Sequence, residues 1–164
     1  YWKMIKNKIS GFKIIFVLCV LVSTNLLAEK LGDLTRQSPI SKSVTLKGKI
    51  GENHYFEPNI VNFSTGKLYK LEIINKSDSK HYFSSSEFSK SIFTRKIQVL
   101  KNGKKISEIK GNITEIEVFP NNVVEWWFVP IKTGKFTDLK CQVKDEVLKK
   151  THSEMGMVGS IIID

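Results

Sequence analysis

Four side chains with soft donor atoms lie close together near the C-terminus of the chain. Ten residues separate Cys141 from His152, and Met155 and Met157 follow soon after the histidine. Thiolate and thioether sulfur and imidazole nitrogen are donors well suited to copper. The run ends at an apolar stretch, residues 160–163, which is typical of a strand. This pattern predicts a metal site on a loop that precedes the last strand.

A one-electron copper site needs one more imidazole than this run supplies. A thiolate and two imidazoles form a trigonal plane around the ion, and a weak thioether on the axis tunes its potential. The second histidine must come from elsewhere, so His81 and His54 are the candidates. His81 follows an apolar strand and a polar turn, and we prefer it. His54 is expected at the opposite end of the preceding strand, provided that this strand is continuous.

Each of these donors also has an ordinary structural interpretation. Free cysteines are often buried and inert, and methionines often fill gaps in a core. Taken together, however, the chain order of His81, Cys141, His152 and Met157 favours metal binding. Met157 is preferred to Met155 as the thioether donor because four residues separate it from His152 and glycines flank it.

Short runs rich in β-branched and aromatic residues recur from Val44 onward, separated by Gly, Asn, Pro and Ser. This spacing predicts an all-β protein, a Greek-key β-sandwich, with one domain over residues 44–164. In residues 123–130, alternation places Val124, Trp126 and Phe128 on one face, which we expect in the core. Asn102-Gly103 predicts a tight hairpin. The expected strands are residues 44–50, 55–63, 67–75, 95–100, 104–110, 113–119, 123–130, 135–141 and 158–163.

The N-terminal 28 residues resemble an export signal. Lysines without any acid precede an apolar run, residues 14–22, and Ala28 supplies a small residue at its end. This is the layout of a secretory signal peptide, and the run is short for a transmembrane helix. We therefore expect a signal peptide at 1–28, a flexible lead-in at 29–43, and a periplasmic or secreted protein. The alternative is an uncleaved segment that tethers the protein to a membrane.

Cleavage after Ala28 would remove Cys19 and leave Cys141 as the remaining thiol. A lone cysteine in an oxidising compartment cannot form an internal disulfide, so it needs another explanation. A metal-binding or reactive role and an inert buried thiol are the two alternatives.

The formal net charge of the chain is +10. Without the four lysines of residues 1–28, 22 basic residues stand against 16 acidic ones, a net of +6. This favours acidic partners, although a solvated basic surface is the simpler interpretation. Nucleic acid is a poor candidate for an exported protein whose lysines are scattered, and we expect a monomer.

Between about residues 52 and 164 the chain resembles the cupredoxins, the blue copper proteins that include plastocyanin and azurin. The terminal His-x4-Met-x-Gly, followed by an apolar strand, is the specific part of the pattern. The matching positions are Phe56, Pro58, Ile60, Gly66, the strand at 68–75, His81, Phe83, Trp127, Pro130, Gly134, Phe136, Cys141, His152, Gly156, Met157, Val158 and Gly159.

The resemblance implies one copper ion that cycles between Cu(I) and Cu(II) and a role as a one-electron carrier between redox proteins, not an enzyme. It implies that His81, Cys141 and His152 are the equatorial ligands and Met157 the axial one. It also implies that His152 lies nearer the surface and offers the electron its exit.

Two features depart from small cupredoxins. The Cys141–His152 loop is charged and is longer than in many small cupredoxins, although longer ligand loops occur in copper nitrite reductases. Residues 134–141 are one residue longer than usual, which suggests a β-bulge. A mobile loop would release metal more easily, so copper delivery is the alternative function. A nitrite reductase is disfavoured because three histidines are too few for a second copper centre in one subunit.

Overall fold

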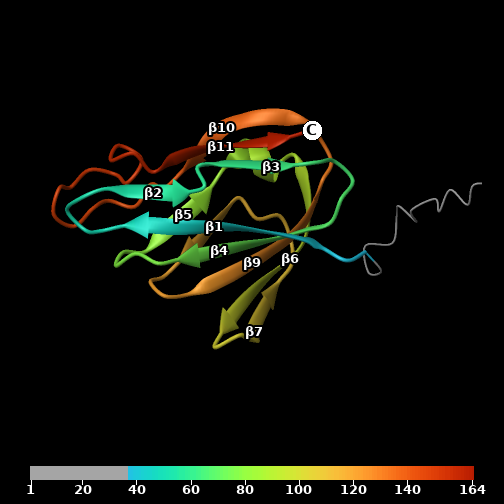
Figure 1. The fold of residues 1–164 in the computed structure, drawn as a ribbon, viewed down its shortest axis with the longest axis horizontal. Coiled ribbons are helices and arrows are strands. Elements are labelled where there is room, and N and C mark those ends of the chain that lie inside the picture. Colours follow the sequence, from blue (N-terminus) through green and yellow to red (C-terminus); the bar gives the residue numbers. More distant parts are fainter. Residues whose placement is uncertain (1–36) are drawn as a thin grey trace, which may run out of the picture. The chain divides into compact units, whose positions relative to one another are not determined.

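The computed structural model describes residues 37–164, which form eleven strands and one short helix in two sheets (Figure 1). The expected signal peptide lies outside the described residues. The elements are β1 (Ile40–Gly48), β2 (His54–Glu57), β3 (Ile60–Phe63), β4 (Tyr69–Asn75), β5 (His81–Ser84), α2 (Ser86–Ser89), β6 (Ile92–Lys101), β7 (Lys104–Ile109), β8 (Glu115–Val118), β9 (Val123–Pro130), β10 (Gly134–Lys140) and β11 (Val158–Ile163).

The larger sheet has the order β2-β1-β4-β9-β6-β7. Strand β4 alternates strictly between buried and half-buried residues, because one of its faces covers the core. Val124, Trp126 and Phe128 of β9 are buried, as the alternation predicts. The smaller sheet has the order β3-β11-β10-β5-β8. Buried side chains of both sheets form one apolar core, so the prediction of an all-β sandwich is confirmed.

Local turn signals also agree with the structure. Asn102 and Gly103 both have positive φ, 52° and 73°, and Lys101 pairs with Lys104 across the turn between β6 and β7. This is the two-residue hairpin that Asn-Gly favours. The expected bulge occurs in β10, where the register with β11 shifts between Phe136 and Leu139.

The predicted strand at 55–63 is wrong as a single element. It divides at Pro58 into β2 and β3, which belong to different sheets. Proline has no N–H to donate to a ladder, so a strand that contains it tends to break. Strand β5 was not among the expected strands, and β1 begins at Ile40, within the expected lead-in.

Strand directions gather three loops at one end of the sandwich. Strands β1 and β4 are parallel, so the loops that follow Gly48 and Asn75 lie at the same end. Strand β10 ends at this end, and the long loop that begins at Cys141 leads back into β11. Figure 1 shows the three loops side by side, opposite the C-terminus. Among residues 37–164, no helix has the length and apolar character needed to cross a bilayer.

Candidate metal centre

Three side chains with soft donor atoms meet at this end of the sandwich. His81 is the first residue of β5, Cys141 directly follows β10, and His152 lies in the loop before β11. The three side chains are fully buried. His81 is 60 positions from Cys141 and 71 from His152 in the sequence. Pairing within the smaller sheet and the loop that β10 and β11 share hold these distant residues together.

The three inward donor atoms form a triangle with two nearly equal edges and one shorter edge. The Cys141 Sγ atom lies 3.7 Å from His81 Nδ1 and 3.6 Å from His152 Nδ1, and the two Nδ1 atoms are 3.0 Å apart. A point in their plane lies about 2.0 Å from all three, close to metal–nitrogen bonds of about 2.0–2.1 Å and somewhat short of metal–thiolate bonds of about 2.3 Å. The triangle therefore has the dimensions of a trigonal metal plane.

Neutral imidazoles are available at the site. Burial, with a contribution from His152 and His54, lowers the pKa of His81 to about 3. Burial and the nearby His54 lower the pKa of His152 to about 4, although Asp145 opposes this shift. Both rings are therefore uncharged near neutral pH, which is the form that binds a metal ion.

The tautomer of His81 is set by Ser77, whose Oγ lies 2.7 Å from His81 Nε2. The single hydroxyl proton of Ser77 has two acceptors at 2.8 Å, Asn75 Oδ1 and the carbonyl of Ser79. The hydroxyl oxygen is then free to accept from His81 Nε2–H. The lone pair of the ring is consequently on Nδ1, which faces the triangle.

The sulfur of Cys141 accepts a hydrogen bond from the backbone N–H of Tyr82 at 3.2 Å. Burial raises the pKa of the thiol, while backbone N–H groups, including that of Tyr82, act in the opposite direction. A metal ion must therefore displace the thiol proton on binding, and the backbone donor is already aimed at the thiolate that results.

Met157 is fully buried and belongs to the same core cluster as Cys141. Its backbone N–H donates to the carbonyl of His152 at 2.8 Å, and its carbonyl accepts from Cys141 N–H at 3.2 Å. Met155 is only partly buried. The backbone of Met157 is thus bonded to two of the residues that form the triangle.

A third histidine, His54, lies in this cluster, so its expected position at the opposite end is wrong. Ring nitrogens of His54, His81 and His152 lie within 4.8 Å of one another. The break at Pro58 explains the error, because β2 pairs antiparallel with β1 and begins where β1 ends, at the Gly48–His54 pair. The sequence signal was Pro58 inside the predicted strand at 55–63.

His152, like His81, is fully buried and has no direct exposure to solvent. His54 covers it: the two rings are stacked with centroids 3.7 Å apart and planes inclined by 21°. His54 is itself 1% exposed. The route from the metal plane to solvent is therefore closed on this side by another imidazole.

The long loop between Cys141 and His152 folds on itself. The His152 N–H donates to the Val143 carbonyl at 2.8 Å, and Lys144 pairs with Thr151 in an isolated antiparallel bridge. Residues 146–148 form a tight turn within this small hairpin. The additional residues are accommodated outside the base of the loop, so they do not move Cys141 away from His152.

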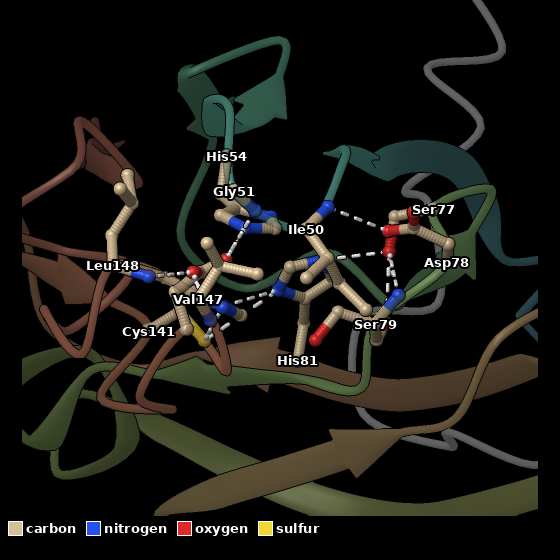
Figure 2. Close-up of polar contacts among 12 residues, drawn as sticks. Ile50, Gly51, His54, Ser77, Asp78, Ser79, His81, Cys141, Val147 and Leu148 are labelled. Carbon is tan, nitrogen blue, oxygen red and sulfur yellow. Dashed lines mark hydrogen bonds and ion pairs between the residues drawn. The ribbon is translucent and has the colours of Figure 1, made fainter.

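Asp145 joins this hairpin to the loop after β1. Its carboxylate accepts from the backbone N–H groups of Gly51, Val147 and Leu148 at 2.7–2.9 Å, and it lies 3.3 Å from His54 Nε2. Figure 2 labels these four contacting residues: Gly51, His54, Val147 and Leu148. These hydrogen-bond donors hold the pKa of Asp145 well below its usual range, and the N–H of Gly51 makes the largest contribution. The residue is buried and ionised, and it fixes two loops to one another.

No family model matches the sequence, and no curated protein matches it significantly. Solved structures do match the fold. A copper-containing nitrite reductase from Thermus scotoductus has a TM-score of 0.53 at 11% identity, over 77% of this chain and 31% of that one. A laccase from Pediococcus acidilactici has a TM-score of 0.53 at 16% identity, over 82% and 28%. This chain spans less than a third of either protein.

An auracyanin from Roseiflexus castenholzii matches over 78% of this chain and 98% of its own length, at 13% identity and a TM-score of 0.45. At these identities the likeness concerns the fold. A cysteine, two histidines and an axial methionine are the donors of a blue copper site. The chain therefore has the cupredoxin fold, and at one end of the sandwich it carries the donor set of a type 1 copper centre.

Proposed function

We propose that the protein is an exported type 1 copper protein that carries single electrons between redox partners. In this proposal His81, Cys141 and His152 are the equatorial ligands and Met157 is the axial one. The triangle of Cys141 Sγ and the two Nδ1 atoms is the observation that carries the proposal. Its dimensions are close to those of a trigonal plane around one ion.

Copper bound here supplies a one-electron couple, and the protein's contribution is a site that changes little between the two oxidation states. Ser77 fixes the ring of His81, and Tyr82 N–H fixes the sulfur of Cys141. The surrounding core excludes water, because all of the proposed ligands are fully buried. Fixed ligands in a dry site require little reorganisation when an electron moves.

The structure of the ligand loop favours electron transfer over copper delivery. A delivery protein needs a ligand that can leave the metal easily. Here the loop is closed at its base by the Val143–His152 hydrogen bond and fixed at its tip by Asp145. These contacts oppose release of the metal.

An enzyme with a second copper centre is disfavoured by the histidine count. The sequence has three histidines. All three lie in a single cluster, that of His54, His81 and His152. None is left to build a separate three-histidine centre within this chain.

The surface near the site supports an acidic redox partner. Exposed lysines outnumber exposed acids on the three loops at this end of the sandwich. The lysines are Lys49, Lys76, Lys80, Lys144, Lys149 and Lys150, and the acids are Glu52, Asp78, Glu146 and Glu154. Such charges accelerate association with an acidic protein, and salt screens the effect.

Absorption spectroscopy of the copper-loaded protein tests the proposal. A thiolate–copper bond of this type should give an intense band at about 600 nm, and the band should disappear on reduction and return on oxidation. Cys141→Ser should abolish it, because the sulfur that gives rise to the band is lost. Gln142→Ala is the matched control, since the side chain of this neighbouring residue is exposed, and it should keep the band. A colourless copper complex of the wild-type protein would reject the electron-carrier role.

A further inference from the structure

We propose that His54 is a positioning residue that, together with Asp145, caps the ligand His152 and retains the metal, and that His54 is not itself a ligand. The inference rests on the proposed copper occupancy of the site. Its basis is the placement of a third, fully enclosed imidazole directly against one of the proposed ligand rings.

The contact between the two rings is a face-to-face stack. The centroids of His54 and His152 are 3.7 Å apart and the planes are inclined by 21°. The lone pairs of an imidazole lie in the plane of its ring, so the lone pairs of nearly parallel stacked rings do not converge on one ion. His54 therefore covers the ring of His152, but its own lone pairs do not point toward the ion that His152 would bind.

The two nitrogens of His54 have different surroundings, and Nδ1 has no hydrogen-bond partner among the described residues. The Nε2 atom faces the Asp145 carboxylate at 3.3 Å. The Nδ1 atom lies against the backbone of Gly48, where an added Cβ would be 2.6 Å from it. The face of the His54 ring lies on the ring of His152.

Asp145 keeps the cap in place. It belongs to the ligand loop, whereas Gly51 and His54 belong to the segment between β1 and the end of β2. One carboxylate oxygen contacts Gly51 N–H and His54 Nε2, and the other accepts from Val147 and Leu148. The carboxylate thus holds the ring of His54 against a ligand that lies further along the same loop.

The consequence is retention of the metal. For copper to leave, His152 must turn away from the triangle, and the ring of His54 occupies the space on the stacked face of His152. Loss of a group that supports a ligand commonly weakens metal binding about 10–100-fold. Removal of the His54 ring should therefore accelerate copper release by a similar factor.

The test compares His54→Ala, His54→Phe and Asp145→Ala in the full chain, with Tyr55→Ala on the same strand as the control. Copper transfer to EDTA is followed by the blue band. We expect His54→Ala and Asp145→Ala to release copper about 10–100-fold faster than wild type, with the band still present. His54→Phe restores the ring but not the contact with Asp145, so it should release copper more slowly than His54→Ala, at a rate between that variant and wild type. Tyr55→Ala should release it at a rate near wild type.

Two results would overturn the proposal. Wild-type release rates in His54→Ala would show that the ring retains nothing. Loss of the blue band in both His54 variants would show that His54 is a ligand. Because phenylalanine is bulkier than histidine, nitrogen hyperfine spectroscopy of the wild-type protein supplies a second measurement: two coordinated imidazoles are expected, and three would overturn the proposal. Failure of the electron-carrier role would appear separately, as a wild-type protein that is not blue.

Discussion

The backbone N–H of His152 donates to the carbonyl of Val143 at 2.8 Å, which closes the long ligand loop at its base. The residues between them form a separate small hairpin, with Lys144 bridged to Thr151. Loop length and ligand geometry are therefore independent in this protein. A ten-residue separation of cysteine and histidine is compatible with a compact donor triangle.

Replacement of residues 145–150 by Asn-Gly tests this independence. The pair favours a tight turn between Lys144 and Thr151, so we expect the blue band of the copper-loaded protein to remain. The loss of Asp145 should also accelerate copper release, because the cap over His152 loses its support. A colourless copper complex of the shortened protein would contradict the independence of loop and site.

Ser77→Ala removes the group that holds the ring of His81. The His81 Nε2–H would lose its acceptor, and we expect copper affinity to fall about 10-fold or more. The matched control is Ser79→Ala, because the Ser79 hydroxyl donates to the carbonyl of the adjacent Lys80. Competition with a chelator measures both affinities, and equal values would show that Ser77 does not orient the ligand.

Gly48→Ala should disturb the cap. An added Cβ would lie 2.6 Å from His54 Nδ1 and 2.3 Å from the Asn53 carbonyl oxygen. We expect the free energy of unfolding to fall by about 1–3 kcal/mol more than in Gly111→Ala. Gly111 is a close control, because its φ of 130° resembles the 137° of Gly48 and an added Cβ there meets nothing within 4 Å. If urea unfolding shows the same loss of stability in both variants, the loss comes from backbone strain alone and not from contact with His54.

Acid should destabilise the metal-free protein. The pKa values of His81 and His152 are lowered to about 3 and about 4 in the folded state, against about 6.5 in an unfolded chain. As the pH falls below about 6.5, the unfolded chain binds protons that the folded protein does not, so stability decreases. Urea unfolding should show a loss on the order of 2 kcal/mol between about pH 7 and pH 5.5. Replacement of His152 by Leu should reduce this loss, and a pH-independent wild-type stability would contradict the buried, neutral state.

The sequence predicted the parts of the fold that depend on local pattern. Alternation in β9 identified Trp126 and Phe128 as core, and Asn102-Gly103 identified a hairpin, because side-chain period and turn chemistry are properties of adjacent residues. Strand β5 was missed because it is short, and it is defined by pairing with β8 and β10, which are distant in the sequence.

The candidate site, like the fold, could be predicted from the sequence only in part. His81, Cys141 and His152 could be selected because their types and order suit copper, and the structure brings their donor atoms together. The position of His54 could not be derived in this way, since it depends on the break at Pro58 and on the pairing of β2 with β1. The role of Asp145 depends on a contact with His54 between residues 91 positions apart, for which the local sequence carries no signal.

The proposed function depends on one ion binding between the sulfur of Cys141 and the Nδ1 atoms of His81 and His152. X-ray absorption spectroscopy at the copper edge of the loaded protein measures this environment directly. We predict two nitrogen neighbours and one short thiolate neighbour, at about 2.0–2.3 Å. A copper environment of nitrogen and oxygen alone, without a short sulfur neighbour, would show that the ion does not bind there.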